Sequence, residues 1–467
     1  MHPICAMRPI PFVVDHPKIH PHPFTFFPTQ ASTVCHICAM IKELDPTYIC
    51  IQCVFVIHKN CIGFPHVIRI SRHPHRISFT SSLPSSRNLS CGVCRKQVDN
   101  NYGAYSCKTC ESYFVHSKCA LNPNVWDGKE LEGVPEKDDE IDDGEPFKRI
   151  ADGIILHPFH SHHLRFEISK EAYDANKYCR GCALPVYEGG FYSCVECNFI
   201  LHENCANASR MKRYPLYPHP LTLKVATKGI GTDEGIFQCN QCAREGTGYF
   251  YEHHIDGRNF KLDLRCALIT EPFDFQGHKH PLFLASEPYE LTLCHMCKEE
   301  SDDSKLICIE CDYILCYRCA TFPYKARYKH DNHILIICDR EKGSGQQDWC
   351  EICEGKIEEG GMLFFYKCHD CCIALHVECL LGRDIYMKPG DTIKDSVSVV
   401  VKTSKLTRPK WIEFWILLNS SLSRPICIGC RDRCPFPIFF KGYNDKIFCS
   451  QRCIRTRLRN NSIRHVT

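Results

Sequence analysis

The sequence lacks two features that define large classes of proteins: a long apolar run and a strong net charge. Its best apolar stretch, Trp415 to Leu418, is far too short to cross a bilayer, which takes about 20 apolar residues in a helix. A formal net charge of +3 over 467 residues gives no electrostatic reason to expect a nucleic-acid or membrane partner. We therefore expect no transmembrane segment, and proteins rather than lipid or nucleic acid as partners.

Signals for secretion and for common enzyme chemistry are also missing. Proline, histidine and aspartate interrupt the segment from Met1 to His20, so no secretory leader is expected there. The chain has no glycine-rich phosphate loop, no dinucleotide-binding turn and no nucleophile–base pair outside its cysteine pattern. These absences predict an intracellular protein, cytoplasmic or nuclear, that is not an enzyme.

What the chain has in abundance is cysteine, with 37 residues, and histidine, with 26. They recur in repeats of roughly 50–60 residues, a period typical of tandem modules. Modules this small rarely bury enough apolar surface to fold without disulfides or metal. Because an intracellular chain keeps its thiols reduced, we expect the cysteines to bind metal rather than to form disulfides. Sets of four thiolate and imidazole ligands favour Zn2+.

One pattern recurs six times: C-x2-C, a gap of 10–14 residues, then C-x2-C-x4-H-x2-C. Repeat 2 has one extra residue before the histidine, and repeat 5 replaces the histidine by Cys316, which is also a good zinc ligand. Repeat 4 has lost the second C-x2-C and ends in Asp263 and Cys266. A carboxylate binds zinc less tightly than thiolate or imidazole, so we expect repeat 4 to be weakened or half-loaded.

The ligands of each repeat are expected to interleave between two metal ions. The first C-x2-C is predicted to join the H-x2-C, and the second to join a histidine upstream of the repeat and a ligand downstream. H-x-H pairs such as His20 and His22 precede the repeats. The second histidine of each pair is predicted to open the next module, and the first is a candidate to close the module before it. Before repeat 6 the pair is stretched to His330 and His333.

Apolar side chains also recur at fixed positions beside the ligands. Three residues before the ligating histidine position stand Phe55, Tyr113, Phe199, Phe260, Tyr313 and Ile373. An aliphatic side chain such as Ile57 stands one residue before it, and this alternation predicts a short half-buried strand. A tyrosine such as Tyr48 stands two residues before the third cysteine. We expect the aromatic rings to form a small core around the metal sites; stacking on a bound ligand is the alternative.

Beyond the repeats, the chain ends in a second kind of cysteine cluster. The spacing C-x2-C, eighteen residues, C-x3-C at residues 427–453 is typical of a four-cysteine zinc module. Cys434 is left over from it, as Cys338 and Cys372 are from repeat 6. The arginines around and after Cys453 form a basic tail. This tail could be a solvated terminus, a nucleic-acid contact or a targeting signal.

These patterns divide the chain into segments. The acidic stretch at 128–156 should be a solvated hinge, because its like charges repel and little of it can be buried. The connector contains a possible strand at Val397 to Val401. The predicted segments are a truncated repeat tail at 1–15, repeat 1 at 20–73, repeat 2 at 74–127, the acidic linker at 128–156, repeat 3 at 157–217, the degenerate repeat 4 at 218–277, repeat 5 at 278–330, repeat 6 at 331–388, a connector at 389–424, the C-terminal zinc module at 425–455 and the basic tail at 456–467.

The order H-x-H, C-x2-C, C-x2-C-x4-H-x2-C-A resembles the plant cysteine/histidine-rich divergent C-one domain proteins, relatives of the phorbol-ester/diacylglycerol-type zinc finger. The alanine after the last cysteine recurs as Ala120, Ala206, Ala267 and Ala320. The resemblance implies small metal-dominated α+β modules in a tandem array of cross-braced zinc fingers, each with short strands, one short helix and about two zinc ions. It also implies a role in plant intracellular signalling or stress response.

The ligands predicted from the repeats and the resemblance together are His22, Cys35, Cys38, Cys50, Cys53, His58, Cys61, His75, Cys91, Cys94, Cys107, Cys110, His116, Cys119, His163, Cys179, Cys182, Cys194, Cys197, His202, Cys205, His219, Cys239, Cys242, Asp263, Cys266, His280, Cys294, Cys297, Cys308, Cys311, Cys316, Cys319, His333, Cys350, Cys353, Cys368, Cys371, His376, Cys379, Cys427, Cys430, Cys449 and Cys453.

The hypothesis that follows is a zinc-binding, non-enzymatic adaptor or scaffold that binds proteins. A protein-disulfide reductase is one alternative, since C-x2-C is also a redox motif, but zinc would hold those thiolates. A diacylglycerol-binding module is another, although the loops at Val98–Asn101 and Lys356–Glu359 are polar or acidic and costly to bury in lipid. Chromatin and ubiquitin-ligase fingers, whose ligand order ends in a C-x2-C, fit less well.

Overall fold

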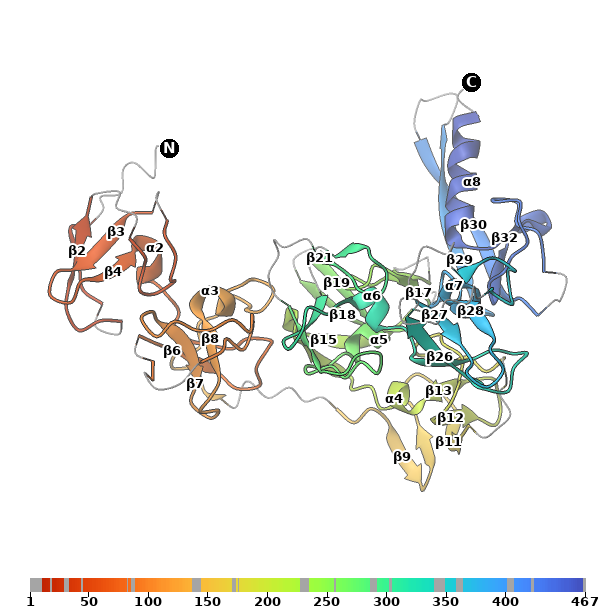
Figure 1. Cartoon of the computed structure of the whole chain (residues 1–467), viewed down its shortest axis with the longest axis horizontal. Helices are drawn as coiled ribbons and strands as arrows, with labels where there is room; N and C mark the ends of the chain where they lie inside the picture. Colours follow the sequence, from red (N-terminus) through yellow and green to blue (C-terminus); the bar gives the residue numbers. More distant parts are fainter. Residues whose placement is uncertain are drawn as a thin grey trace. The chain divides into compact units, whose positions relative to one another are not determined.

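The computed structural model describes residues 11–16, 19–28, 33–42, 45–81, 83–84, 89–136, 144–169, 174, 176–226, 235–255, 258–285, 292–301, 305–339, 349–357, 364–400, 407–420 and 424–464. The chain forms two compact units (Figure 1). The first comprises Met1–Ile141 with Arg213–Pro220 and Ala285–Glu287, and the second comprises Asp142–Lys212, Leu221–Leu284 and Pro288–Thr467. In the described part of the chain, every helix is too short or too polar to traverse a bilayer.

Repeats 1 and 2 each form a four-stranded antiparallel sheet followed by a one-turn helix (Figure 1). The strand orders are β1-β2-β3-β4 and β5-β6-β7-β8. The elements are β1 (Val13–Val14), β2 (Phe24–Phe27), β3 (Thr47–Cys50), β4 (Phe55–His58), α2 (Lys59–Ile62), β5 (Val67–Ile68), β6 (Ile77–Thr80), β7 (Ala104–Cys107), β8 (Phe114–His116) and α3 (Ser117–Ala120).

The two repeats share one continuous core, which runs from Ile19 to Val125. Where they meet, the Gly103 amide donates a hydrogen bond of 2.7 Å to the carbonyl of His36. A Cβ atom at Gly103 would lie 2.4 Å from the Phe79 ring, so any larger residue here would force that ring to move. Repeats 1 and 2 are therefore packed as a pair.

Repeats 3 to 6 and the C-terminal module also consist of a sheet followed by a helix, with three to five strands in the sheet and a longer helix in the C-terminal module. The main sheets have the orders β13-β12-β11-β10-β9, β14-β15-β18-β19, β20-β23-β24, β25-β26-β27-β28 and β29-β30-β31-β32. Their elements are β9 (Lys148–Ala151), β10 (Ile154–Leu156), β11 (His163–Ile168), β12 (Gly190–Cys194), β13 (Ile200–His202), α4 (Glu203–Ala206), β14 (Met211–Tyr214), β15 (Tyr217–Val225), β16 (Phe237–Gln238), β17 (Glu245–Gly246), β18 (Tyr249–Ile255), β19 (Arg258–Asp263), α5 (Leu264–Ala267), β20 (Leu282–Leu284), β21 (Thr292–Leu293), β22 (Glu300–Ser301), β23 (Lys305–Cys308), β24 (Ile314–Cys316), α6 (Tyr317–Ala320), β25 (Lys325–Arg327), β26 (Ile334–Asp339), β27 (Phe364–Lys367), β28 (Ala374–His376), α7 (Val377–Leu381), β29 (Thr392–Val400), β30 (Thr407–Leu418), β31 (Ile438–Lys441), the 3-10 helix η4 (Tyr443–Asp445), β32 (Ile447–Phe448) and α8 (Gln451–Arg464).

A buried tyrosine anchors the central hairpin in several repeats. Its ring is enclosed, and its hydroxyl donates to a backbone carbonyl about 40 residues earlier in the chain, outside the hairpin. The bonds run from Tyr48 to Pro11 (2.9 Å), from Tyr105 to Pro65 (2.5 Å), from Tyr251 to Ser209 (2.8 Å) and from Tyr366 to Pro323. Tyr251 shows that repeat 4 keeps this anchor although it has lost the second C-x2-C.

The prediction of tandem strand-rich modules with one short helix each is confirmed, and several expected segment boundaries differ from the structure. Residues 148–156 of the expected acidic linker form β9 and β10 of the repeat 3 sheet. The expected connector supplies β29 and β30 to the C-terminal sheet, and α8 runs across the expected start of the basic tail. The truncated repeat tail, for which residues 1–10 were the main sign, lies largely outside the described residues.

Candidate metal centres

Each complete repeat brings its ligands together in two separate groups. We call the group that contains the first C-x2-C the inner site and the group that contains the second C-x2-C the outer site. In repeat 1 the inner site is Cys35, Cys38, His58 and Cys61, with every ligand atom within 4.8 Å of the others and all four side chains buried. Twelve groups of three or more candidate ligands occur among the described residues. The interleaved pairing of the first C-x2-C with H-x2-C is what the structure shows.

The turn between the first two cysteines has the same backbone in every module. The residue after the second cysteine has a positive φ and its amide donates to the carbonyl of the first cysteine, at 2.8–3.0 Å. These residues are Ala39, Arg95, Ala183, Ala243, Lys298, Glu354 and Arg431. A left-handed conformation without glycine is strained, and such strain gathers at functional sites. The turn aims both sulfur atoms at one point.

Strand and helix deliver the other two inner ligands. The histidine ends a strand (β4 in repeat 1), and the last cysteine lies in the one-turn helix that follows it (α2 in repeat 1). The amide of the residue at the histidine position donates to the sulfur of the first cysteine in six modules, at 3.3–3.5 Å. These bonds come from His116, His202, Asp263, Cys316, His376 and Cys449. An N–H donor favours the thiolate over the thiol.

The inner distances fit zinc. Bonds of about 2.3 Å to sulfur and about 2.0 Å to nitrogen at tetrahedral angles put neighbouring ligand atoms about 3.5–3.8 Å apart. The Nδ1 atom of His58 lies 3.4 Å from Sγ of Cys38 and 3.8 Å from Sγ of Cys61. In repeat 6 His376 Nδ1 lies 3.3 Å from Sγ of Cys353 and 3.8 Å from Sγ of Cys379.

The second ring nitrogen of the inner histidine, Nε2, lies close to a backbone carbonyl in three repeats. The Nε2 atoms of His116, His202 and His376 lie 3.1–3.2 Å from the carbonyls of Gln97, Pro185 and Lys356. A carbonyl partner at Nε2 fixes the proton there and leaves Nδ1 free to bind metal, the arrangement typical of metal-ligating histidines.

Neighbouring thiols bias the first cysteine toward the charged form. Hydrogen bonds from Cys38 and Cys61 lower the pKa of Cys35 well below its usual value. A hydrogen bond from Cys379 lowers the pKa of Cys350, and one from Cys449 lowers the pKa of Cys427. The clusters therefore carry at least one thiolate ready to bind a cation.

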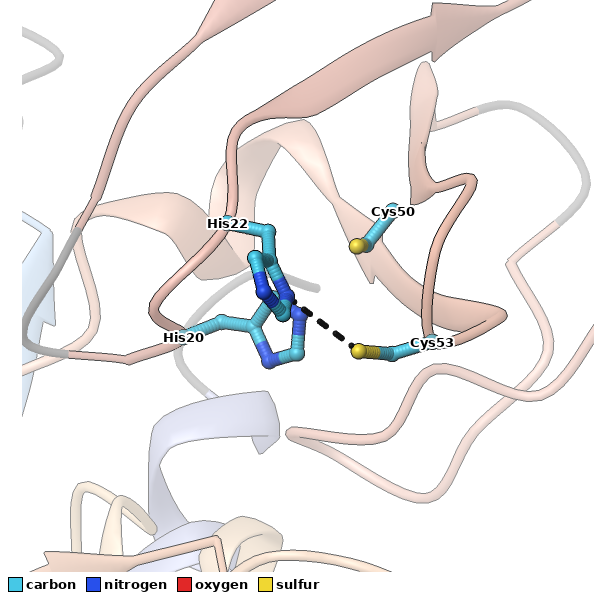
Figure 2. A group of neighbouring side chains, drawn as sticks. All are labelled: His20, His22, Cys50 and Cys53. Carbon is cyan, nitrogen blue, oxygen red and sulfur yellow. Dashed lines mark hydrogen bonds between the residues drawn. The ribbon is translucent and has the colours of Figure 1, made fainter.

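The outer site is made by both histidines of the upstream pair. Figure 2 shows His20 and His22 facing Cys50 and Cys53, with His22 Nδ1 3.2 Å from Sγ of Cys53. Repeat 2 joins His73 and His75 to Cys107 and Cys110, and repeat 3 joins His160 and His162 to Cys194 and Cys197. In repeat 5, His278 Nε2 lies 3.4 Å from Cys311 and His280 Nδ1 lies 3.6 Å from Cys308.

Two predictions about these ligands are wrong. The first histidine of each pair does not close the preceding module, because it shares its site with the second histidine. In repeat 3 the ligands are His160 and His162 instead of His163. His163 begins β11, where it pairs with Leu156 and its side chain is exposed. Sequence reasoning named His163 because three histidines stand within four residues there.

The aromatic residue three positions before the inner histidine stacks on the first outer histidine. The ring centroids are 4.8 Å apart for Phe55 and His20, 3.8 Å for Tyr113 and His73, 4.0 Å for Phe199 and His160, and 4.1 Å for Tyr313 and His278. Burial lowers the pKa of His73 to about 4 and also lowers that of His20 and His160. The neutral imidazole is the form that binds metal. The aromatic side chains that we expected to form a small core therefore also orient the first outer histidine.

Repeat 6 uses a carboxylate where the others use the first histidine. Asp331 and His333 stand 12 and 14 residues after Cys319, the same spacing that His278 and His280 have from Cys266. The Cys371 thiol donates to Asp331 at 3.0 Å, and the other oxygen of Asp331 lies 2.9 Å from His333 Nδ1. The interpretation of His330 as the first member of this pair is corrected to Asp331. The aliphatic Ile373 takes the place of the stacking ring, since no imidazole is present to stack on.

Among its described residues, repeat 4 retains an inner site and no second C-x2-C to form an outer one. The Cys242 thiol donates to Asp263 Oδ2 at 3.1 Å, while the amide of Cys266 donates to Oδ1 at 2.8 Å. Asp263 is thus both a candidate ligand and the N-cap of α5. Burial raises its pKa to about 7. The hairpin of β18 and β19 fills the place of the second C-x2-C, and His219 lies in β15, where its role as a ligand stays a prediction.

The C-terminal cysteines form one more site of the inner type. Sγ of Cys449 lies 3.8 Å from that of Cys430 and 3.4 Å from that of Cys453. Cys453 lies in α8, as the last cysteine of a repeat lies in its short helix. The leftover Cys434 is fully buried. The predicted four-cysteine module is therefore assembled in the structure.

Comparison with protein families agrees with this geometry. The family model "C1 domain" matches residues 18–62, 71–120, 158–206, 276–320 and 328–380, a little over half of the chain. The model "C1 domain-like, C-terminal" matches residues 414–454. Searches of curated proteins and of solved structures gave no match. Repeat 4, without its second C-x2-C, falls between the matched segments. The chain therefore belongs to the C1 domain family, as a tandem array of five matched C1 repeats with a C1-like C-terminal domain.

Proposed function

We propose that the chain is a zinc-binding, non-enzymatic scaffold that binds other proteins. The observation that carries this proposal is the agreement between ligand–ligand distances and a tetrahedral zinc site, repeated along the chain. The donor sets support zinc over harder cations, because nitrogen and sulfur ligands predominate over oxygen. About two ions would be held in each complete repeat, and one each in repeat 4 and the C-terminal module.

Metal analysis of the full chain, purified gently under reducing conditions, tests this. We expect roughly ten to thirteen zinc ions per chain, from two sites in each complete repeat. X-ray absorption at the zinc edge should show mixed sulfur and nitrogen ligands with bonds of about 2.3 and 2.0 Å. Three or fewer ions per chain would contradict the array.

A purely structural role for the cysteines supports a scaffold rather than an enzyme. The paired thiols face a common metal position, and their attack on a disulfide would require release of that metal. We expect no sustained reduction of insulin disulfides by the zinc-loaded chain. Turnover that disappears when one C-x2-C pair is changed, with zinc retained elsewhere, would favour the reductase alternative.

The partner we propose for the C1 repeats is a protein rather than diacylglycerol. The loop after the inner turn of repeat 2 is self-contained: Val98 is buried, and Asp99 accepts bonds of 2.9 Å from the amide and side chain of Asn101. Inserting such a loop into lipid would bury the charge of Asp99. Diacylglycerol-dependent binding to vesicles would contradict this. The proposed setting, plant intracellular signalling or stress response in the cytoplasm or nucleus, is supported only by the resemblance of the motif.

A further inference from the structure

A hollow lined by arginines lies within the second unit, where repeat 4, repeat 5, the segment after α7 and the start of α8 meet. Its volume is about 510 Å³. Two carboxylates, Glu245 and Asp384, belong to its lining. The arginines that line it are Arg244, Arg318, Arg383, Arg452, Arg455 and Arg459.

Three of these guanidinium groups are held in fixed positions. Arg455 donates two bonds of 2.7 Å to the carboxylate of Glu245. Arg383 donates to Glu378 at 2.7 Å and lies 5.1 Å from the centre of the Phe436 ring. The buried Arg244 donates to the Thr321 hydroxyl at 2.6 Å. A rigid frame of donors lowers the entropic cost of binding an anion.

The lining carries more positive charge than its own carboxylates balance. Asp384 is engaged by the amide of Gln451 at 3.1 Å, and Glu245 by Arg455. Outside the hollow, Glu299, Glu378 and Asp395 approach Arg318, Arg383 and Arg455. Within the described residues Arg452 and Arg459 form no ion pair, and Arg244 meets a hydroxyl instead of a carboxylate. Arg452, Arg455 and Arg459 follow one face of α8 at helical spacing.

We propose that this hollow binds a small anion that carries several phosphate groups. Guanidinium forks match phosphate oxygens with paired, charge-assisted bonds. The volume falls in the range of small-molecule sites, about 300–1,000 Å³. Two of the lining side chains, Ala243 and Ile385, are apolar and all the others are polar or charged, so a polar ligand is the best fit. The ligand would be a soluble polyphosphate or the headgroup of a phosphorylated lipid, and this site goes beyond the proposed scaffold function.

Calorimetric titration of the zinc-loaded full chain with inositol hexakisphosphate tests the proposal. We expect saturable binding that the double variant R452A/R459A weakens by at least about tenfold, because two charge-assisted contacts are lost. The matched control is R457A, which removes an exposed arginine of α8 that does not line the hollow, and its Kd should stay within about twofold of wild type. The variant R452K/R459K keeps the charge but loses the forks, so its Kd should lie between wild type and R452A/R459A.

Three results would overturn the site: no saturable binding, wild-type affinity in both double variants, or equal weakening by R457A. Zinc content and circular dichroism would verify that each variant is folded. Vesicles of phosphatidylcholine with phosphatidylinositol 4,5-bisphosphate distinguish the two ligand sources. Sedimentation that is lost in R452A/R459A and competed by inositol hexakisphosphate points to a lipid headgroup. Binding of the soluble anion without sedimentation points to a free polyphosphate.

Discussion

Removal of one buried hydroxyl should loosen the hairpin of a single repeat. The Tyr105 side chain is fully buried, and its hydroxyl donates a bond of 2.5 Å to the carbonyl of Pro65. Tyr105→Phe keeps the ring but leaves that carbonyl without its donor. Loss of one such hydrogen bond costs about 1 kcal/mol, so amides of β7 and β8 should exchange roughly fivefold faster.

Native-state hydrogen exchange followed by mass spectrometry measures this effect, and the chain offers a matched control. Tyr192 stands at the equivalent position of repeat 3, where it packs against Phe147 and Phe166. In the described part of the chain its hydroxyl makes no hydrogen bond, so Tyr192→Phe should change exchange in β12 by less than about threefold. Equal acceleration in both variants would refute the reasoning, since the ring would then matter and the hydroxyl would not.

Three further changes test the metal sites. Asp263→His should strengthen zinc retention in repeat 4, as a nitrogen ligand replaces an oxygen, and slower release to a chelator at that repeat alone would show it. Cys53→Ser removes an exposed outer ligand and should unfold repeat 1 while repeat 6, in the other unit, keeps its exchange protection; loss of protection throughout the chain would contradict this. Phe199→Leu should release the outer metal of repeat 3 several-fold faster while leaving its inner site loaded, and equal release from both would show that the stack on His160 has no special role.

The inner ligands could be predicted from sequence because short-range spacing determines them. A C-x2-C turn closes within a few residues, and the strand end and one-turn helix place His58 and Cys61 beside it without any long-range information. The outer ligands were harder to predict. In repeat 3 a strand begins directly after the ligating histidines, and the sequence does not show at which residue that strand starts. His163 therefore competed with His160 and His162. Asp331 was not predicted because the other outer sites begin with a histidine and His330 stands beside it, although the spacing of Asp331 from Cys319 carried the signal.

The arginine-lined hollow could not be predicted at all. Its residues come from positions as distant as Arg244 and Arg459, and only the packing of several modules in the second unit brings them together. In the sequence, the arginines of α8 looked like a basic tail. The structure instead places three of them on one helix face, where they line the same hollow as Glu245 and Asp384.

The left-handed turn at the first cysteine pair lets the modules differ in what they display without differing in shape. At the same backbone position, Lys298 and Arg431 present a positive charge, Glu354 presents a negative one, and Ala39 presents almost no side chain, all exposed. Metal binding would order that backbone before any partner binds, so the partner's binding would cost little conformational entropy. A partner that contacts such a turn would meet the same rigid backbone with a different side chain in each module, so replacing that one surface residue would change the specificity with the fold left intact.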